Sequence, residues 1–329
     1  MVNDPYDNLP LPKSLPKAFL FRRLHSIAGL FFILFLAEHM MTNSESALLI
    51  GEQGSGFVRA VNFLQSLPYL NFIEFFLLAV PIGIHILLGI LYFCEARYNS
   101  FSSDGSRPSL TRYSRNHAFT WQRITAVIIV FGVIAHVTSM RFLQRPQEVT
   151  STPGTKFAIP VAADPGLLTL SPRLKATLIT PDSQAPLLAF IQLRMRTADH
   201  QIQRALTPSL QAAEELQKDR LKSTHAFIAS LQPTEVQWTA LCEDFGTACL
   251  LIVRENFRIL WICALYTVFV TAAAFHAANG LWTFSISWGI PLNEGGRRVI
   301  RGIGVMLGAA LLAGGLSSIW LTYWVTLYS

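Results

Sequence analysis

The sequence predicts an all-α integral membrane protein with five transmembrane helices and a long insert outside the cytoplasm. The first observation is composition: 51% of the 329 residues are hydrophobic and 14% are charged, whereas soluble proteins carry roughly 25% charged residues. The second is that five apolar stretches are long enough to cross a bilayer, which takes about 20 helical residues. These stretches are residues 21–41, 69–93, 119–140, 257–284 and 299–328.

Basic residues predict the orientation of these helices. The net charge of +6 could indicate nucleic-acid binding, but the cations flank the apolar stretches, so we expect no nucleic-acid partner. The flanking cations on one side are Lys13, Lys17, Arg22, Arg23, Arg97, Arg107, Arg112, Arg115, Arg297, Arg298 and Arg301. The opposite short loop, residues 44–68, carries only Arg59. The positive-inside rule then predicts a cytoplasmic N-terminus and an external C-terminus.

Four segments follow from these limits. Residues 1–20 are a polar cytoplasmic tail without the cleavage site of a signal peptide. Residues 21–141 hold the first three helices, and residues 257–329 hold the last two. Residues 142–256 form the insert, in which apolar residues at helical spacing predict one or two surface helices.

The four cysteines exclude several kinds of metal site. The sequence has no CxxC pair, which argues against a zinc ribbon or a thioredoxin-type centre. It also has no CxxCH motif, so any haem should be b-type and not covalently attached. Cys242 and Cys249 share one polar segment, where a disulfide could form.

One histidine lies deep inside each of the first four apolar stretches: His39, His85, His136 and His276. An ionisable side chain at membrane depth is costly and usually has a function. A helix rises about 1.5 Å per residue, and counting from each membrane face places His39 with His136 in an outer layer and His85 with His276 in an inner layer. Two layers of two imidazoles suit two six-coordinate haems, so we expect the helices to bundle around them.

Three glycines lie four residues from these histidines, on the same helix faces: Gly89, Gly132 and Gly280. A flat porphyrin needs small residues beside its ligand, but small residues also serve helix packing in membranes. The sequence leaves both interpretations open.

Seven segments carry a family resemblance: FRRLHSIAG (21–29), EHMMTN (38–43), SLPYLNFIEFF (66–76), IHILLG (84–89), WQRITA (121–126), AHVTSMR (135–141) and FHAANGLWTFSISWGI (275–290). Together they resemble the cytochrome b membrane-anchor subunit of succinate:quinone oxidoreductases, respiratory complex II. The match is to the type with one anchor chain, five helices and two haems. The last segment is the most specific.

The resemblance implies a role for each histidine pair. In that family, the residues that match His85 and His276 ligate the inner haem, and those that match His39 and His136 ligate the outer haem. A flavoprotein (FAD) subunit in the cytoplasm would oxidise succinate. An iron–sulfur subunit would pass the electrons to the inner haem, the outer haem and then a quinone, usually menaquinone. The chain itself, in the inner cell membrane, would carry electrons without binding succinate.

Two features depart from the family. The insert is much longer than the usual connection, which puts the transfer of outer-side contacts in doubt. Some two-haem fumarate reductases have a proton-transferring glutamate two residues before the fourth histidine, and this chain has Ala274 there.

Polar residues near the two layers are candidates for further contacts. Those that could reach haem propionates are Arg22, Arg23, His25, Ser26, Asn279 and Arg141. Those that could bind the quinone or accept its protons are Glu38, Gln65 and Glu74. Each could instead be a topology anchor or a satisfied interfacial group.

Four alternatives compete with this interpretation. The chain could anchor a fumarate reductase that works in the reverse direction, or another quinol-linked dehydrogenase with two haems. It could be a haem-free transporter that uses the histidines as a proton relay. It could also be a purely structural anchor. Full activity after replacement of His276 would favour the relay.

Overall fold

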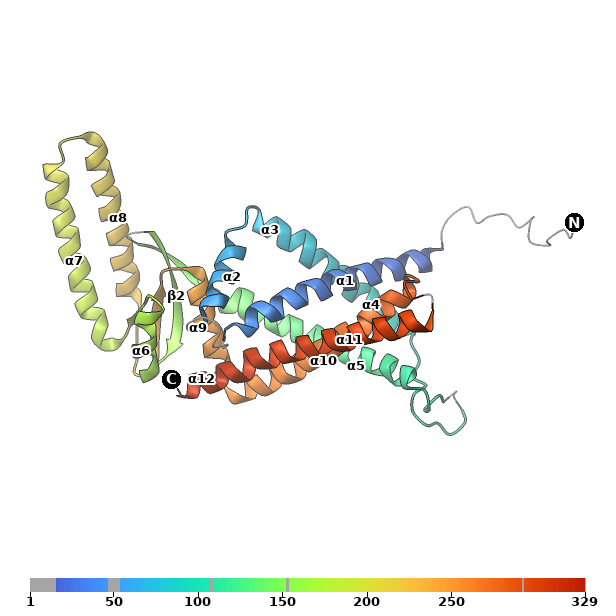
Figure 1. Ribbon diagram of the computed structural model, residues 1–329. Coiled ribbons are helices and arrows are strands. Elements are labelled where there is room, and N and C mark those ends of the chain that lie inside the picture. The colour runs from blue at the N-terminus through green and yellow to red at the C-terminus, as the bar shows by residue number, and fades with distance from the viewer. Residues whose placement is uncertain (1–15, 47–53, 107–108, 152–153, 292, 329) are drawn as a thin grey trace, which may run out of the picture. The chain divides into compact units, whose positions relative to one another are not determined.

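The computed structural model describes residues 16–46, 54–106, 109–151, 154–291 and 293–328 (Figure 1). Most of the predicted cytoplasmic tail, with Lys13, lies outside these ranges, as does Arg107.

Within the described residues, five helical segments are long and apolar enough to cross a membrane, which confirms the predicted all-α membrane protein. They are Lys17–Ser44, Leu70–Glu95, Ser114–Leu143, Leu260–Ser287 and Glu294–Leu327. The first and fourth segments are the single helices α1 (Lys17–Ser44) and α10 (Leu260–Ser287). The second segment consists of α3 (Leu70–Ile73), η2 (Glu74–Ala79) and α4 (Val80–Glu95), and the third consists of α5 (Ser114–Val137) and η3 (Thr138–Leu143). The fifth segment consists of α11 (Glu294–Leu316), η4 (Ser317–Leu321) and α12 (Thr322–Tyr328). The η segments are π-helical, a widened turn that is frequent at functional sites.

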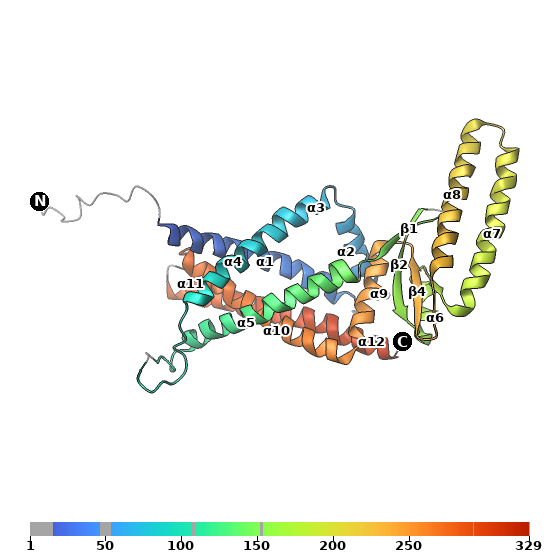
Figure 2. The ribbon, with the colours of Figure 1, turned by 180° about the vertical axis from the view of Figure 1, so that it is seen from behind.

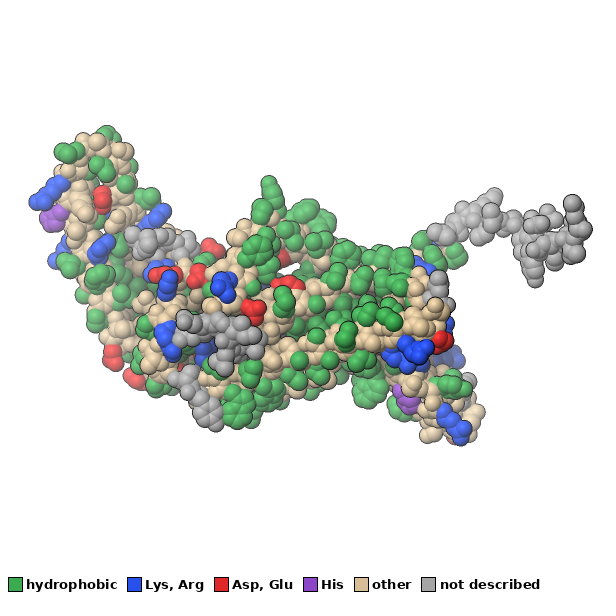
Figure 3. Space-filling model, in the orientation of Figure 1, with side chains coloured by type: hydrophobic (Ala, Val, Ile, Leu, Met, Phe, Trp, Pro, Cys, Tyr) green, Lys and Arg blue, Asp and Glu red, His purple; other side chains and the backbone are tan. Residues whose placement is uncertain are grey.

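Apolar side chains cover these segments. Leu34, Leu87 and Phe131 are each more than 60% exposed, and Figure 3 shows hydrophobic side chains along the long helices. Contiguous exposed apolar surface of this extent is rare on water-soluble monomers and suits contact with lipid.

The chain forms two compact units, each described by itself. The first unit contains Met1–Ala37, Asn71–Val127 and Ala273–Ala309. The second unit contains Glu38–Leu70, Ile128–Ala272 and Ala310–Ser329. Each of the helices α1, α5, α10 and α11 therefore has one part in the first unit and the other part in the second unit.

The insert combines helices with a sheet that the sequence analysis did not predict. Its elements are β1 (Gln147–Ser151), β2 (Gly154–Ala162), α6 (Pro165–Arg173), β3 (Ala176–Ile179), α7 (Pro181–Arg204), α8 (Pro208–Ser230), β4 (Gln237–Cys242) and α9 (Phe245–Phe257). The strands form an antiparallel sheet in the order β1-β2-β4-β3. The one or two predicted surface helices are present as α7 and α8.

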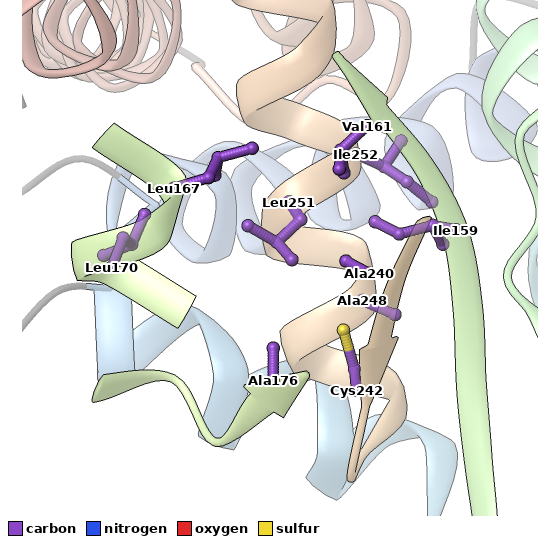
Figure 4. Packing of buried hydrophobic residues seen from close by; sticks show 10 residues of the cluster. All are labelled: Ile159, Val161, Leu167, Leu170, Ala176, Ala240, Cys242, Ala248, Leu251 and Ile252. Carbon is purple, nitrogen blue, oxygen red and sulfur yellow. The ribbon is translucent and has the colours of Figure 1, made fainter. Parts of the chain in front are cut away.

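Successive residues of a strand point to opposite faces of the sheet, and other elements of the insert pack against both faces. Ile159 and Val161 of β2 and Cys242 of β4 belong to a core that includes residues of α6 and α9 (Figure 4). On the other face, Ala158 and Leu241 pack with Phe227 of α8.

The helices α7 and α8 lie side by side as an antiparallel hairpin (Figures 1 and 2). Each begins with a threonine whose hydroxyl accepts a hydrogen bond from a backbone N–H of the first turn: Thr180 for α7 and Thr207 for α8. Ile191 of α7 and Ile228 of α8 meet in a buried cluster.

A short helix, α2 (Ser55–Gln65), lies between the first and second spans in the sequence and contacts the insert. The Asn62 amide donates to the carboxylate of Asp244 at 2.8 Å and accepts the Gly246 N–H at 2.8 Å. Since Asp244 caps the N-terminus of α9, this contact fixes α2 against the start of α9.

Candidate haem sites

The four membrane histidines form two pairs, one in each unit. In the first unit, the ring centres of His85 on α4 and His276 on α10 are 6.2 Å apart, with planes at 81°. In the second unit, those of His39 on α1 and His136 on α5 are 5.8 Å apart, with planes at 79°. These are the two pairs expected from counting depth along the helices.

The spacing within each pair suits two axial ligands on one iron. A metal–imidazole bond is about 2 Å long, and the ring centre lies roughly 1 Å beyond the nitrogen, so two such rings on opposite sides of an iron have centres roughly 6 Å apart. Among the described residues, no group of three or more His, Cys, Asp or Glu side chains could hold a metal ion. The geometry therefore fits haem better than a protein-ligated metal cluster.

Backbone carbonyls hold the inner pair. Nδ1 of His85 lies 3.0 Å from the His25 carbonyl oxygen, and Nδ1 of His276 lies 3.2 Å from the Gln122 carbonyl oxygen. Because a carbonyl only accepts, Nδ1 carries the hydrogen in both rings. Nε2 then keeps its lone pair, as a metal-ligating histidine requires.

Side chains hold the outer pair. Nδ1 of His136 lies 3.0 Å from the hydroxyl oxygen of Tyr266 on α10. Nδ1 of His39 lies 3.5 Å from the amide nitrogen of Asn43, one turn along α1, which also donates to the His39 carbonyl at 2.9 Å. A hydroxyl can accept the Nδ1 hydrogen of His136, whereas an amide nitrogen only donates, so the contact with Asn43 does not place a hydrogen on Nδ1 of His39.

The glycines near the histidines serve packing to different degrees. A Cβ at Gly132 would overlap the Phe269 ring, which supports helix packing at that position. A Cβ at Gly89 or Gly280 would make only ordinary contacts, at 3.5 Å or more. A glycine that the sequence analysis did not single out, Gly29 of α1, lies closest to one of the four histidines, because its Cβ would be 2.8 Å from Cε1 of His85.

Five of the six propionate candidates belong to the unit of the inner pair. The His25 ring stacks on His85 with centres 4.0 Å apart, and its Nδ1 is buried without a hydrogen-bond partner. Such an unpartnered nitrogen beside His85 fits a site with a polar cofactor group. Asn279 is engaged with the Gln122 side chain at 2.9 Å, while Arg22 is exposed and Ser26 half-buried.

Arg23 has protein partners already. Its guanidinium lies between the rings of Phe19 and Trp288, at 4.8 and 4.7 Å, and it donates to the Ser287 carbonyl. The sixth candidate, Arg141 of η3, belongs to the unit of the outer pair.

The three quinone candidates are divided between the two units. Glu38 accepts a hydrogen bond from Thr42 at 2.8 Å on α1, and Gln65 is exposed at the end of α2. Both belong to the second unit, whereas Glu74 of η2 belongs to the first.

The chain is similar to one curated protein, the succinate dehydrogenase cytochrome b558 subunit of Bacillus subtilis (strain 168). The two are 30% identical over 126 residues, which is 38% of this chain and 56% of that protein. The chain thus spans about half the length of the curated relative that it matches. No family model and no solved structure matches the chain.

Proposed function

We propose that this chain is the two-haem cytochrome b anchor of a succinate dehydrogenase. The observation that carries the proposal is the presence of two histidine pairs, each with ring centres about 6 Å apart. In His85, His276 and His136, Nδ1 also faces an oxygen atom. The similarity to the Bacillus subtilis subunit supports the same function.

His85 and His276 would hold the inner haem b, and His39 and His136 would hold the outer one. Bound haem supplies one-electron transfer. The residues of the chain supply orientation, because the carbonyls at Nδ1 of His85 and His276 and the Tyr266 hydroxyl at Nδ1 of His136 would hold these rings in place. The apolar helices supply a site without bulk water.

The partners follow from this role. A flavoprotein subunit with FAD and an iron–sulfur subunit would bind the cytoplasmic side, and a quinone, menaquinone in our proposal, would accept the electrons near the outer side. Moving one charge across the membrane is worth about 2.3 kcal/mol per 100 mV, so the membrane potential would act on this reaction. An anchor of fumarate reductase would use the same sites in the reverse direction.

Haem content and spectra of the purified chain test the proposal. We expect two haems b per polypeptide from pyridine-haemochrome and reduced-minus-oxidised spectra. The variants His85→Ala and His276→Ala should lose the same spectral component, whereas His39→Ala and His136→Ala should lose the other one.

The control is His200→Ala, since His200 is exposed on α7 of the insert and should leave both haems in place. Folded wild-type chain without haem would overturn the proposal and favour the proton relay. Loss of one component by residues from different pairs, such as His85 and His136, would overturn the assigned pairing.

A further inference from the structure

We propose that Tyr266 is a positioning residue for His136 and thereby sets the reduction potential of the outer haem. The inference rests on the proposed function, because it takes His136 as an axial ligand. It goes further by giving a specific role to a residue of α10, the helix that also carries His276.

Only one direction of the hydrogen bond between His136 and Tyr266 is consistent with iron ligation by His136. If Nε2 of His136 faces the iron, Nδ1 carries the ring hydrogen and donates it to the Tyr266 hydroxyl oxygen, 3.0 Å away. An acceptor on Nδ1 makes the imidazole more basic and a better ligand. A more basic ligand stabilises ferric iron over ferrous iron, so the contact lowers the potential of the outer haem.

Aromatic packing holds the phenol in this position. The Tyr266 ring meets the buried Phe257 edge-on at 5.1 Å and Phe269 at 6.1 Å. Phe269 in turn packs where Gly132 lacks a side chain. The hydroxyl is therefore held in position before any cofactor binds, as is required of a residue that orients a metal ligand.

In the inner pair, backbone carbonyls are the nearest partners of Nδ1, and the Thr125 hydroxyl oxygen lies slightly farther away, 3.3 Å from Nδ1 of His276. Both inner ligands donate to backbone carbonyls, those of His25 and Gln122, which no substitution at those positions removes. His136 relies on a side chain, so one substitution can change its partner and leave the fold intact.

Tyr266→Phe removes the oxygen and keeps the ring. We expect both haems to be retained and the ferric-to-ferrous equilibrium of the outer haem to shift about tenfold toward ferrous, which corresponds to about 59 mV for one electron. The inner haem should keep its potential. An optical redox titration and the EPR g-values of each ferric haem measure these effects without any enzyme assay.

Tyr323→Phe is the matched control. Tyr323 belongs to the same unit, and its ring meets Trp320 and Trp324, so both potentials should stay at the wild-type values. A second variant, Phe269→Leu, keeps the phenol but loosens it, and should shift the outer potential in the same direction by less.

The outcomes separate this inference from the proposed function. A Tyr266→Phe chain with two haems, unchanged potentials and unchanged g-values would overturn the role of Tyr266 and leave the haem assignment standing. Wild-type chain without haem would overturn both.

Discussion

Gly29 shows how closely one residue can constrain the ring of a membrane histidine. A Cβ there would lie 2.8 Å from Cε1 of His85 and 3.0 Å from its Nδ1, closer than side chains approach one another without displacement. The same Nδ1 donates to the His25 carbonyl on α1, so a shift of the ring would also strain that hydrogen bond.

We therefore expect Gly29→Ala to lower the content of the inner haem at least several-fold and to leave the outer haem in place. Haem counting and low-temperature spectra of the purified variant would measure this. Gly83→Ala is the control on α4, because a Cβ at Gly83 would meet nothing within 4 Å. Equal haem content in the two variants would show that the ring of His85 tolerates the extra methyl group.

The two histidine pairs could be predicted at the scale of single residues, whereas their hydrogen-bond partners could not. Depth depends on counting residues from a membrane face, which uses only the rise of a helix. The partners of Nδ1 come from neighbouring helices: the carbonyls of His25 and Gln122, and the hydroxyl of Tyr266. Nothing local in the sequence indicates which carbonyl will face which ring.

At the scale of elements, the sequence analysis did not predict the sheet of the insert, because its strands pair with strands that lie far away in the sequence. The longest strand, β2, pairs with β4 through partners such as Phe157 and Cys242, which are far apart in the sequence. Pro160, which normally argues against a central strand, also lies within β2. The hairpin helices were easier to predict, since their apolar residues recur within a few positions.

At the contact between β4 and α9, the Cys242 thiol is buried and the Cys249 thiol is half-buried. Burial, with the carboxylate of Asp244 nearby, raises the pKa of Cys242 and of Cys249 to about 12. All four cysteines are free, so the disulfide that the sequence allows between these two is not formed. A folded insert therefore keeps both thiols neutral at ordinary pH.

The sign of the pH dependence follows from these raised pKa values. Neutral thiols contribute stability that is complete below about pH 9, the ordinary thiol pKa, and is lost as pH rises toward about 12. Near pH 8 we expect Cys242 and Cys249 to react with iodoacetamide on the order of a thousand times more slowly than in unfolded chain.

Mass spectrometry of labelled peptides would measure the reaction at each cysteine, with the exposed Cys94 as the reference in detergent. Labelling of Cys242 at pH 8 as fast as in urea would contradict the buried position of β4. Labelling that begins only at strongly alkaline pH, together with loss of insert structure, would agree with it.

For the whole molecule, five spans constrain which parts share a side of the membrane. An odd number of crossings puts the two ends of the chain on opposite sides. Three crossings precede the insert, so the insert must share a side with the C-terminus. Arg115, Arg297 and Arg301 flank spans on the side of the N-terminus, which the positive-inside rule assigns to the cytoplasm.

Reporter fusions would test this topology. Alkaline phosphatase, which is active only outside the cytoplasm, should be active when placed after Leu206, 95% exposed between α7 and α8, and at the C-terminus. It should be inactive after Asp104, exposed between the second and third spans. A fluorescent protein that folds only in the cytoplasm should give the reverse pattern. Phosphatase activity after Asp104 but not after Leu206 would invert the chain, and would move the His39–His136 pair to the cytoplasmic side, where the proposed iron–sulfur subunit would meet it first.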